Sequence, residues 1–460
     1  MPVETQERIE VGAGLKDIAV DVVARAMKAG ATAADAIARD GNEFSTLVRL
    51  GEVETLKESG ARALGLRIFV GKRAAATHTS DFSGEGIERL VSSAIILARA
   101  TSEDPIAGLP DAASLGSLKS DLDLYYDDVY SLSTADRIDY ARRAEAAAMA
   151  ADRRITNSDG GSFDAATGYK VLANSLGFVG EYRRSYCSVS AVPIAQAEGS
   201  AMQRDYWYSA SRTLRKLESP EAVGRKAAER TLRRVGARKV ATQRVPVVFD
   251  PMVSRGLIDH IFDAVNGDAI YRHASYLAGK LGEQIAGENI TIIDDGTMVG
   301  GFGSSPFDGE GVPTRRTVVV ERGVLKNYLL NTYTARKLKL QTTGNAARGL
   351  TGNPGIGSGN FYLQPGEKDP KDILRDIPSG LYVTEFLGFG VNLVTGDFSR
   401  GASGLWIENG ELTFPVEEIT VAGNLKDMFR NVSAIGNDLE FRSSIAAPTL
   451  RIDGMTIAGE

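Results

Sequence analysis

Residues 245–265 of this chain read VPVVFDPMVSRGLIDHIFDAV and contain a strand signal followed directly by a helix signal. The first five residues predict a buried strand. The stretch from Pro251 to about Val265 predicts a helix, because its apolar residues recur at helical spacing. The apolar face consists of Val253, Leu257, Ile258, Ile261, Phe262 and Val265. Arg255, Asp259 and Asp263 recur every four residues on the other face, which favours a core helix with an exposed charged stripe.

A metal site on the same helix is the alternative, with Asp259, His260 and Asp263 as ligands. Asp259 and His260 are adjacent, so their side chains diverge by about 100° around a helix and converge poorly on one ion. The chain has only three histidines, His78, His260 and His273, which limits the metal chemistry that it could perform alone. The residues by themselves therefore favour the core helix.

The part of the chain before this helix predicts an antiparallel sheet with flanking helices. Helical spacing predicts helices at residues 15–29, 87–100, 134–151 and about 220–235. Short alternating segments predict strands at residues 35–38, 45–50, 52–57, 63–70 and 74–79, with turns at Asp40-Gly41, Gly51, Gly60 and Gly71-Lys72. Residues 154–213 return to strands, with turns expected at residues 159–161 and at Gly177.

The part after residue 236 is rich in predicted strands and in glycine. Strands are expected at residues 290–294, 316–321, 324–330, 381–386, 391–394, 404–408, 411–414 and 450–452. Two glycine-dense loops stand out, at residues 296–311 and 342–359. We therefore expect an α+β protein with an N-terminal α+β domain at residues 1–236 and a β-rich C-terminal domain at residues 237–460.

Composition excludes several classes of protein. The 460 residues are 43% hydrophobic and 24% charged with a net charge of −6, which argues against a disordered chain, a basic nucleic-acid binder and attachment to anionic lipid by charge. No secretory signal or membrane-spanning segment is apparent, and the only cysteine is Cys187. These features predict a cytoplasmic protein without an intrachain disulfide, in which Cys187 is a small core residue.

Other patterns carry less weight. The chain has no G-x-S-x-G motif and no P-loop, and its Gly-x-Gly loops do not follow a strand as a dinucleotide fingerprint would. Ten basic residues lie between Arg212 and Lys239, opposed by three glutamates. We interpret this run as a solvated helix that leads from one domain into the next, with an anion-binding patch as the alternative.

Several collinear blocks beginning at residues 245–295 resemble the TldD/PmbA family, also called the TldD/TldE or "modulator of DNA gyrase" family. The blocks that follow are DDGT (294–297), DGEGVPT (308–314), TGN (343–345), GLYVT (380–384), IENGE (407–411), IGNDL (435–439) and APTL (447–450). They cover the C-terminal half densely and in order. The N-terminal half resembles the family more in layout than in motifs.

The resemblance also implies what this chain lacks. In the TldD branch the corresponding helix carries H-E-x-x-x-H, and a C-terminal cysteine completes a zinc site. The aligned positions here are Ile258, Asp259 and Asp263, and the cysteine-bearing segment is replaced by residues 440–446, EFRSSIA. A catalytic zinc ion is held by about three protein ligands. Because the aligned positions do not supply them, the chain resembles the zinc-less PmbA (TldE) branch.

The resemblance then implies a function in a complex. It implies a heterodimer with a TldD-like subunit that holds the zinc and cleaves unfolded or extended peptides, while this chain binds no cofactor and helps to enclose the substrate. Gly301, Gly303, Thr343, Gly344 and Asn345 are candidates for the channel lining, with ordinary turn architecture as the alternative. Without its partner, the chain could form a homodimer.

Two other functions stay open at this point. One is a stand-alone peptide-binding or adaptor protein with no hydrolytic role. The other is an independent hydrolase that uses carboxylates such as Asp259 and Asp263. The natural peptide and any cleavage preference cannot be inferred from the residues.

Overall fold

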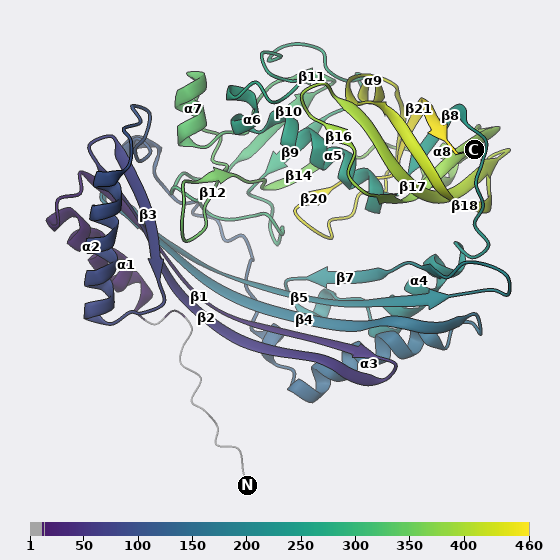
Figure 1. The fold of residues 1–460 in the computed structure, drawn as a ribbon, viewed down its shortest axis with the longest axis horizontal. Helices are drawn as coiled ribbons and strands as arrows, with labels where there is room; N and C mark the ends of the chain where they lie inside the picture. Colours follow the sequence, from purple (N-terminus) through teal and green to yellow (C-terminus); the bar gives the residue numbers. More distant parts are fainter. Residues whose placement is uncertain (1–11, 13, 460) are drawn as a thin grey trace, which may run out of the picture.

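The computed structural model describes residues 12 and 14–459 and has two halves. In Figure 1 the long strands of the N-terminal half curve beneath the sheets of the C-terminal half. Helices α1 and α2 stand at one end of the curved sheet, and α3 lies on the side that faces away from the C-terminal half. The predicted α+β class, with an antiparallel N-terminal sheet and flanking helices, is confirmed.

The N-terminal sheet has seven strands in the order β3-β2-β1-β4-β5-β6, with β7 also paired to β5. Each of the strand pairs is antiparallel. The bounds are β1 Ala33–Arg49, β2 Glu52–Val70, β3 Arg73–Thr79, β4 Ile155–Asn174, β5 Val179–Ala195, β6 Gln203–Arg204 and β7 Trp207–Ser211.

Three turns predicted from glycine were wrong. Asp40-Gly41 and Gly60 lie inside β1 and β2, and residues 159–161 lie inside β4. A Cβ atom at Gly41 would lie 2.5 Å from the carbonyl oxygen of Thr167, so this glycine permits close approach of β1 and β4 instead of a turn. Gly51 and Gly177 do lie in turns, with φ of 82° and 88°.

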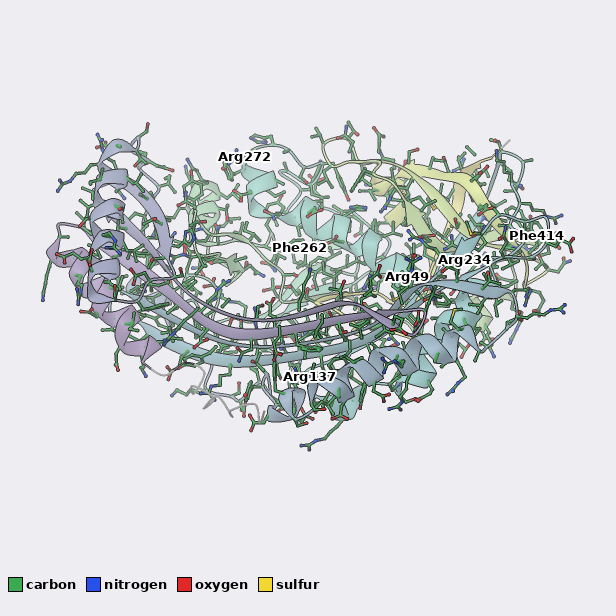
Figure 2. The ribbon with its side chains drawn as sticks, turned by 60° about the horizontal axis from the view of Figure 1, so that its bottom comes forward. Arg49, Arg137, Arg234, Phe262, Arg272 and Phe414 are labelled. Atoms are coloured by element: carbon green, nitrogen blue, oxygen red, sulfur yellow. The ribbon has the colours of Figure 1, made fainter. Side chains whose placement is uncertain are left out.

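The four helices of this half confirm the predicted ones within a few residues. They are α1 Leu15–Lys28, α2 Gly84–Ala100, α3 Thr134–Met149 and α4 Pro220–Leu232. Local signals start three of them: the side chains of Ser83, Ser133 and Ser219 each accept a hydrogen bond from a backbone N–H in the first turn. Arg137 extends from α3 (Figure 2), and its guanidinium lies over the rings of Phe44 and Tyr130.

The C-terminal half contains a larger and a smaller sheet. The larger has the order β15-β8-β21-β18-β17-β16 with β19 on β21, the smaller has the order β11-β10-β9-β14-β20, and β12 pairs with β13. The strands are β8 Gln243–Phe249, β9 Ile292–Asp295, β10 Arg316–Glu321, β11 Val324–Leu325, β12 Ala346–Ala347, β13 Gly355–Ile356, β14 Asn360–Leu363, β15 Ser379–Leu387, β16 Val391–Asn392, β17 Asp397–Glu408, β18 Glu411–Asn424, β19 Val432–Ile435, β20 Ile445–Ala446 and β21 Leu450–Ala458. The helices are α5 Pro251–Val265, α6 Gly267–Tyr271, α7 Thr332–Leu338, α8 Pro370–Leu374 and α9 Leu425–Arg430.

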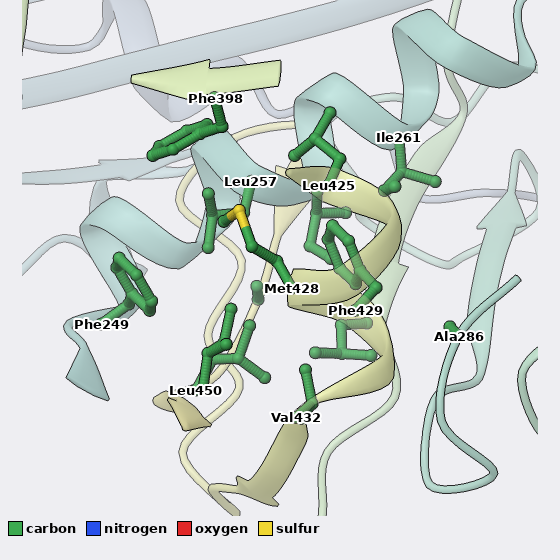
Figure 3. Packing of buried hydrophobic residues seen from close by; sticks show 14 of the residues in the cluster. Phe249, Leu257, Ile261, Ala286, Phe398, Leu425, Met428, Phe429, Val432 and Leu450 are labelled. Atoms are coloured by element: carbon green, nitrogen blue, oxygen red, sulfur yellow. The ribbon is translucent and has the colours of Figure 1, made fainter. Parts of the chain in front are cut away.

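Helix α5 contributes to the main hydrophobic core of this half. Figure 3 shows Leu257 and Ile261 among residues of other elements, including Phe398, Met428 and Leu450. Burial of such side chains is the main favourable term in folding, about 1.5–3 kcal/mol for each. The core therefore fixes which face of α5 can meet solvent.

A buried ion network joins the two halves. The carboxylate of Asp35 on β1 pairs with Arg67 on β2 at 2.5 Å and with Arg348 of the C-terminal half at 2.5 Å. Glu310 lies 3.6 Å from Arg67, and none of these four side chains is more than 4% exposed. Burial by itself would raise the pKa of Asp35, but the two arginines outweigh it and hold that pKa below its usual value.

The basic run between Arg212 and Lys239 is not a solvated face throughout, which corrects the interpretation made from its charge. Arg230 lies 3.4 Å from both Asp205 and Asp250, with its side chain only 5% exposed. Arg234, labelled in Figure 2, pairs with Glu385 of β15 at 2.6 Å. The run therefore helps to fasten α4 to the C-terminal half. In the described part of the chain, the helices are all too short or too polar to cross a bilayer.

Candidate functional site

Helix α5 begins where the sequence predicts it, for local reasons. Asp250 is its N-cap, and a carboxylate oxygen of Asp250 accepts a hydrogen bond from the Met252 N–H at 2.9 Å. Pro251 occupies the first turn, where its missing N–H costs nothing. The other oxygen of Asp250 accepts from the Tyr382 hydroxyl at 3.2 Å and faces Arg230, so the start of the helix is held on two sides.

The three positions aligned with a zinc motif lie on different parts of this helix. Ile258 is fully buried and belongs to the hydrophobic core. Asp259 is exposed, and desolvation raises its pKa while Arg255 opposes that rise. Asp263 is partly buried, and desolvation followed by the charge of Asp259 raises its pKa to about 6.

His260 does not add a ligand to this pair. Desolvation, with a smaller contribution from Arg400, lowers the pKa of His260 to about 4, and its ring lies 6.3 Å from that of Phe398. Its Nε2 atom is buried without a hydrogen-bond partner in the described structure. Burial near the Phe398 ring and the charge of Arg400 thus both favour the neutral form of the imidazole.

The donor set does not fit a zinc ion. Within residues 12 and 14–459, no three His, Cys, Asp or Glu side chains gather closely enough to hold a metal. An alkyl side chain at Ile258 offers no lone pair, and the helix presents Asp259 and Asp263 without a third donor. That the chain binds no metal in solution stays a prediction.

Residues 440–446, where the resemblance would place the cysteine of a zinc site, lead into a stretch that contacts α5. The hydroxyl of Ser254 on α5 donates to the carbonyl oxygen of Pro448 at 2.7 Å. Arg442 places its guanidinium 4.1 Å from the centre of the Trp207 ring and also pairs with Glu218 at 3.3 Å. A hollow of about 300 Å³ next to the start of the helix is lined in part by Arg255 and Arg442, but not by Asp259 or Asp263.

The first glycine-rich loop packs tightly against β14. A Cβ atom at Gly301 would lie 2.6 Å from the Asn360 side chain, and one at Gly303 would lie 2.0 Å from the carbonyl oxygen of Gly359. The N–H of Gly303 donates to the Asn360 side chain at 3.0 Å. These two glycines are required by packing, and contact between them and a peptide stays a prediction.

The second loop is held by its own polar side chains. The Thr343 hydroxyl accepts from the Leu330 N–H at 2.7 Å, and Gly344 adopts a φ of 75°. Asn345 donates to Asp294 at 2.7 Å and to the Gly357 carbonyl oxygen at 3.0 Å. Gly303, Gly344 and Asn345 line a hollow of only about 90 Å³, which is too small for an extended peptide.

Buried carboxylates organise the same loops. Asp308 accepts hydrogen bonds from the N–H groups of Glu310, Val312 and Ala346 at 2.8–3.0 Å. Desolvation, followed by the charge of Glu310, raises the pKa of Asp308. Glu310 in turn accepts from the Thr332 N–H at the start of α7, at 2.9 Å. These acids position backbone and do not face a substrate-sized space.

A larger hollow, of about 560 Å³, lies between the N-terminal sheet and the loops of the C-terminal half. Side chains of β1, β4 and β5 line it on one side, and Phe302 and Leu350 of the two glycine-rich loops line it on the other. Its position between the halves makes it the best candidate in the described structure for a space that a peptide could enter.

Comparison with known proteins identifies the family. Three family models match in order: PmbA/TldA metallopeptidase domain 1 at residues 34–98, the central domain at 127–235 and the C-terminal domain at 242–459. Metalloprotease PmbA of Escherichia coli O157:H7 is 40% identical over 417 residues, which cover 91% of this chain and 90% of that protein. This chain belongs to the PmbA/TldD family.

Other relatives and solved structures are similar to this PmbA/TldD chain over nearly its whole length. A PmbA homologue from Haemophilus influenzae is 38% identical over 435 residues, or 94% of each chain. A solved structure from Bacteroides thetaiotaomicron, described as a proposed modulator of DNA gyrase, has a TM-score of 0.90 at 31% identity and covers 97% of this chain and 99% of that one. TldE from Thermococcus kodakarensis, at 21% identity, shares the fold with a TM-score of 0.86, covering 96% of this chain and 100% of that one. The resemblance inferred from the sequence blocks is confirmed.

Family motifs in the sequence did not reveal the residues of the larger hollow in this PmbA/TldD chain. Arg39, Lys170 and Arg184 lie in the N-terminal half, where the resemblance rests on layout. Alternation along predicted strands could have placed Lys170 and Arg184 on faces of the sheet, but the pairing of strands far apart in sequence was needed to bring them together.

Proposed function

We propose that this chain is the non-catalytic subunit of a two-subunit metallopeptidase that cleaves unfolded or extended peptides. A TldD-like partner would hold the zinc. The observation that carries the proposal is Ile258, a buried alkyl group at the position where a zinc ligand would be required. Membership in a family whose relatives are named metalloproteases supports a role in proteolysis.

The independent hydrolase receives less support. Asp259 and Asp263 lie one turn apart on α5, and neither lines the hollow beside the start of that helix. A pair of carboxylates acting on a peptide needs a space in which substrate and water can meet them. We also propose a cytoplasmic location, because a chain whose only cysteine is Cys187 can form no intrachain disulfide, which fits a reducing compartment.

The decisive experiment is reconstitution. The purified chain, a zinc-loaded TldD-like partner and their mixture are each incubated with an unfolded peptide, and products are followed by mass spectrometry. We expect cleavage that requires the mixture and is abolished by a chelator. A partner with glutamine in place of the glutamate of its H-E-x-x-x-H helix is the matched inactive control.

Two outcomes would overturn the proposal. If the mixture never cleaves while the partner is shown to hold zinc, the chain acts as a peptide-binding or adaptor protein. If the chain cleaves alone, is indifferent to chelator and loses activity on Asp263→Ala, it is a carboxylate-dependent hydrolase.

A further inference from the structure

The larger hollow is built by the register of three neighbouring strands. Arg39 of β1 lies opposite Lys170 of β4, and Lys170 lies opposite Tyr182 of β5. Because side chains alternate along a strand and residues directly opposite share a face, these three side chains form one row across the sheet. The row faces the C-terminal half, where Arg39 donates to the carbonyl oxygen of Arg348 at 2.6 Å.

The next row along the same face provides the space. Gly41 lies opposite Gly168, and Gly168 lies opposite Arg184. The two glycines leave the surface of the sheet bare. A Cβ atom at Gly168 would lie 3.6 Å from Nε of Arg184, so the Arg184 side chain extends across the bare strip.

The charges around the hollow are unbalanced. Arg39, Lys170, Arg184 and Arg212 all line it, and none forms an ion pair with a carboxylate among the described residues. Arg212 is buried and donates to the carbonyl oxygens of Ser185, Gly301 and Phe302 at 2.7–3.0 Å, which are neutral acceptors. Unpaired cations so close together repel one another unless an anion joins them.

The acids of the lining do not neutralise this group. Asp40 is engaged elsewhere, 3.7 Å from Arg62 and 3.1 Å from the N–H of Gly12. Glu43, which also lines the hollow, is exposed and forms no ion pair in the described structure. Excess positive charge therefore remains on the sheet side of the hollow.

The cations around the hollow shift the pKa values of the ionisable groups among them. Desolvation followed by the charge of Arg184 lowers the pKa of Arg39, and the same two causes lower the pKa of Arg212 to about 10. Burial alone would raise the pKa of Tyr182, but Lys170, Arg184 and Arg39 outweigh it and lower that pKa. The cations thus favour a negative charge at the place they surround.

The opposite wall of the hollow is apolar and aromatic. Phe302 and Leu350 line this wall, and the Phe302 ring meets the ring of Tyr186, which extends from β5 on the sheet side, edge to face with centroids 6.2 Å apart. Ala61 and Ala63 of β2 add only methyl groups to the sheet side. A ligand that fills this space needs an anionic group at one end and an apolar part beside it.

We propose that this hollow binds the C-terminal carboxylate of an extended peptide, with Arg39, Lys170 and Arg184 around the carboxylate and the last side chain against Phe302 and Tyr186. A carboxylate matches the paired N–H donors of a guanidinium, and the apolar wall would be left unused by a bare inorganic anion. That the ligand is a peptide rests on the proposed function. That its C-terminal carboxylate binds here rests on the charges and the shape of the hollow.

The test is calorimetric binding to the full chain without any partner. The probes are acetyl-Ala-Ala-Phe as the free acid, the same peptide as the C-terminal amide, an amidated acetyl-Ala-Asp-Phe, and inorganic phosphate. We expect the free acid to bind at least about tenfold more tightly than either amide, because only the acid can form charge-assisted hydrogen bonds at its chain end with the arginines and the lysine. Binding of the acid should weaken as salt is raised.

Matched variants locate the site. Arg184→Gln should weaken the free acid about tenfold and leave the amide unchanged. Arg183→Gln is the control, because Arg183 is the neighbouring residue of β5 but packs over Tyr125 and Tyr169 and does not line the hollow. Lys170→Met is a second test should Arg184→Gln fail to fold.

Equal binding of acid and amide, or loss of acid binding in Arg183→Gln as large as in Arg184→Gln, would overturn the proposal. Equal binding of the internal aspartate peptide would overturn the assignment to the chain end, and tight phosphate binding without peptide binding would make the hollow a simple oxyanion site. The assay needs no cleavage. Failure of the reconstituted peptidase would therefore leave this site standing, and failure here would leave the proposed subunit role untouched.

Discussion

Asp263 is a carboxylate in a place that opposes its charge. Its pKa is raised to about 6 by burial and by Asp259, against an ordinary value of about 3.9. A carboxyl group whose pKa is raised in the folded state lowers the free energy of unfolding when it is ionised. This destabilisation therefore develops as the pH rises from about 4 to 6 and persists at higher pH. Asp263→Asn should therefore raise the free energy of unfolding at pH 7–8 by about 1 kcal/mol, allowing for solvent screening at this partly exposed site.

The measurement is urea unfolding of both proteins at pH 4, 5, 6 and 7.5. The difference between them should be near zero at pH 4 and reach its full size above pH 6. Glu367→Gln is the control, because it removes a carboxylate from an exposed loop position instead of from the partly buried face of a helix. An advantage of Asp263→Asn that is greatest at pH 4 would contradict the assignment.

The glycines of the two glycine-rich loops differ in how tightly the surrounding backbone packs against them. Gly303→Ala would place a methyl group 2.0 Å from the Gly359 carbonyl oxygen, and backbone cannot move aside cheaply. We expect a loss of about 1–3 kcal/mol in the free energy of unfolding. Gly355→Ala, where the added methyl group meets nothing within 4 Å, is the matched control and should change stability by less than about 1 kcal/mol. Equal losses measured by chemical denaturation would contradict this account of the loop.

The helices could be predicted from the sequence because their signals are local. Asp250-Pro251, Ser133 and Ser219-Pro220 lie next to the turns that they start. Glycine inside a strand could not be interpreted in this way. Gly41 faces Gly168 across more than a hundred residues of chain, so the same residue type predicts a turn locally and permits close strands in the fold.

The candidate sites, too, could be predicted only where they depend on residues that are close together in sequence. The absence of a ligand at Ile258 could be inferred from the resemblance, since it depends on one aligned position. The cationic hollow could not be inferred, because Arg39, Arg184 and Arg212 approach one another only through the pairing of strands that are far apart in sequence. The composition of the glycine-dense loops suggested a channel lining. In the structure, several of their glycines, Gly301 and Gly303 among them, permit close packing of backbone and side chains.

Asp35 joins the two halves, so removal of its carboxylate should lower the stability of the entire chain. Asp35→Ala would leave Arg67 with only the more distant Glu310 and deprive Arg348 of its carboxylate partner, both arginines being buried. We expect a loss of about 3–5 kcal/mol in the free energy of unfolding at pH 7. Because the folded-state pKa of Asp35 is lowered, its contribution is present above about pH 4 and should decline as the solution becomes more acidic.

The control is Asp21→Ala, which removes the exposed pair between Asp21 and Arg25 at 2.8 Å and should cost less than about 1 kcal/mol. Both variants are compared with the parent chain by urea denaturation followed by fluorescence. A loss for Asp35→Ala no larger than that for Asp21→Ala would show that the buried network does not hold the halves together.

The ion network between the halves also limits how anything reaches the space they enclose. Separating the two halves would take Arg348 away from Asp35 and Arg67 away from Glu310, and breaking a buried ion pair costs about 3–5 kcal/mol. The two halves should therefore keep their spacing in solution, and a ligand of the larger hollow would have to fit the space as the folded chain provides it.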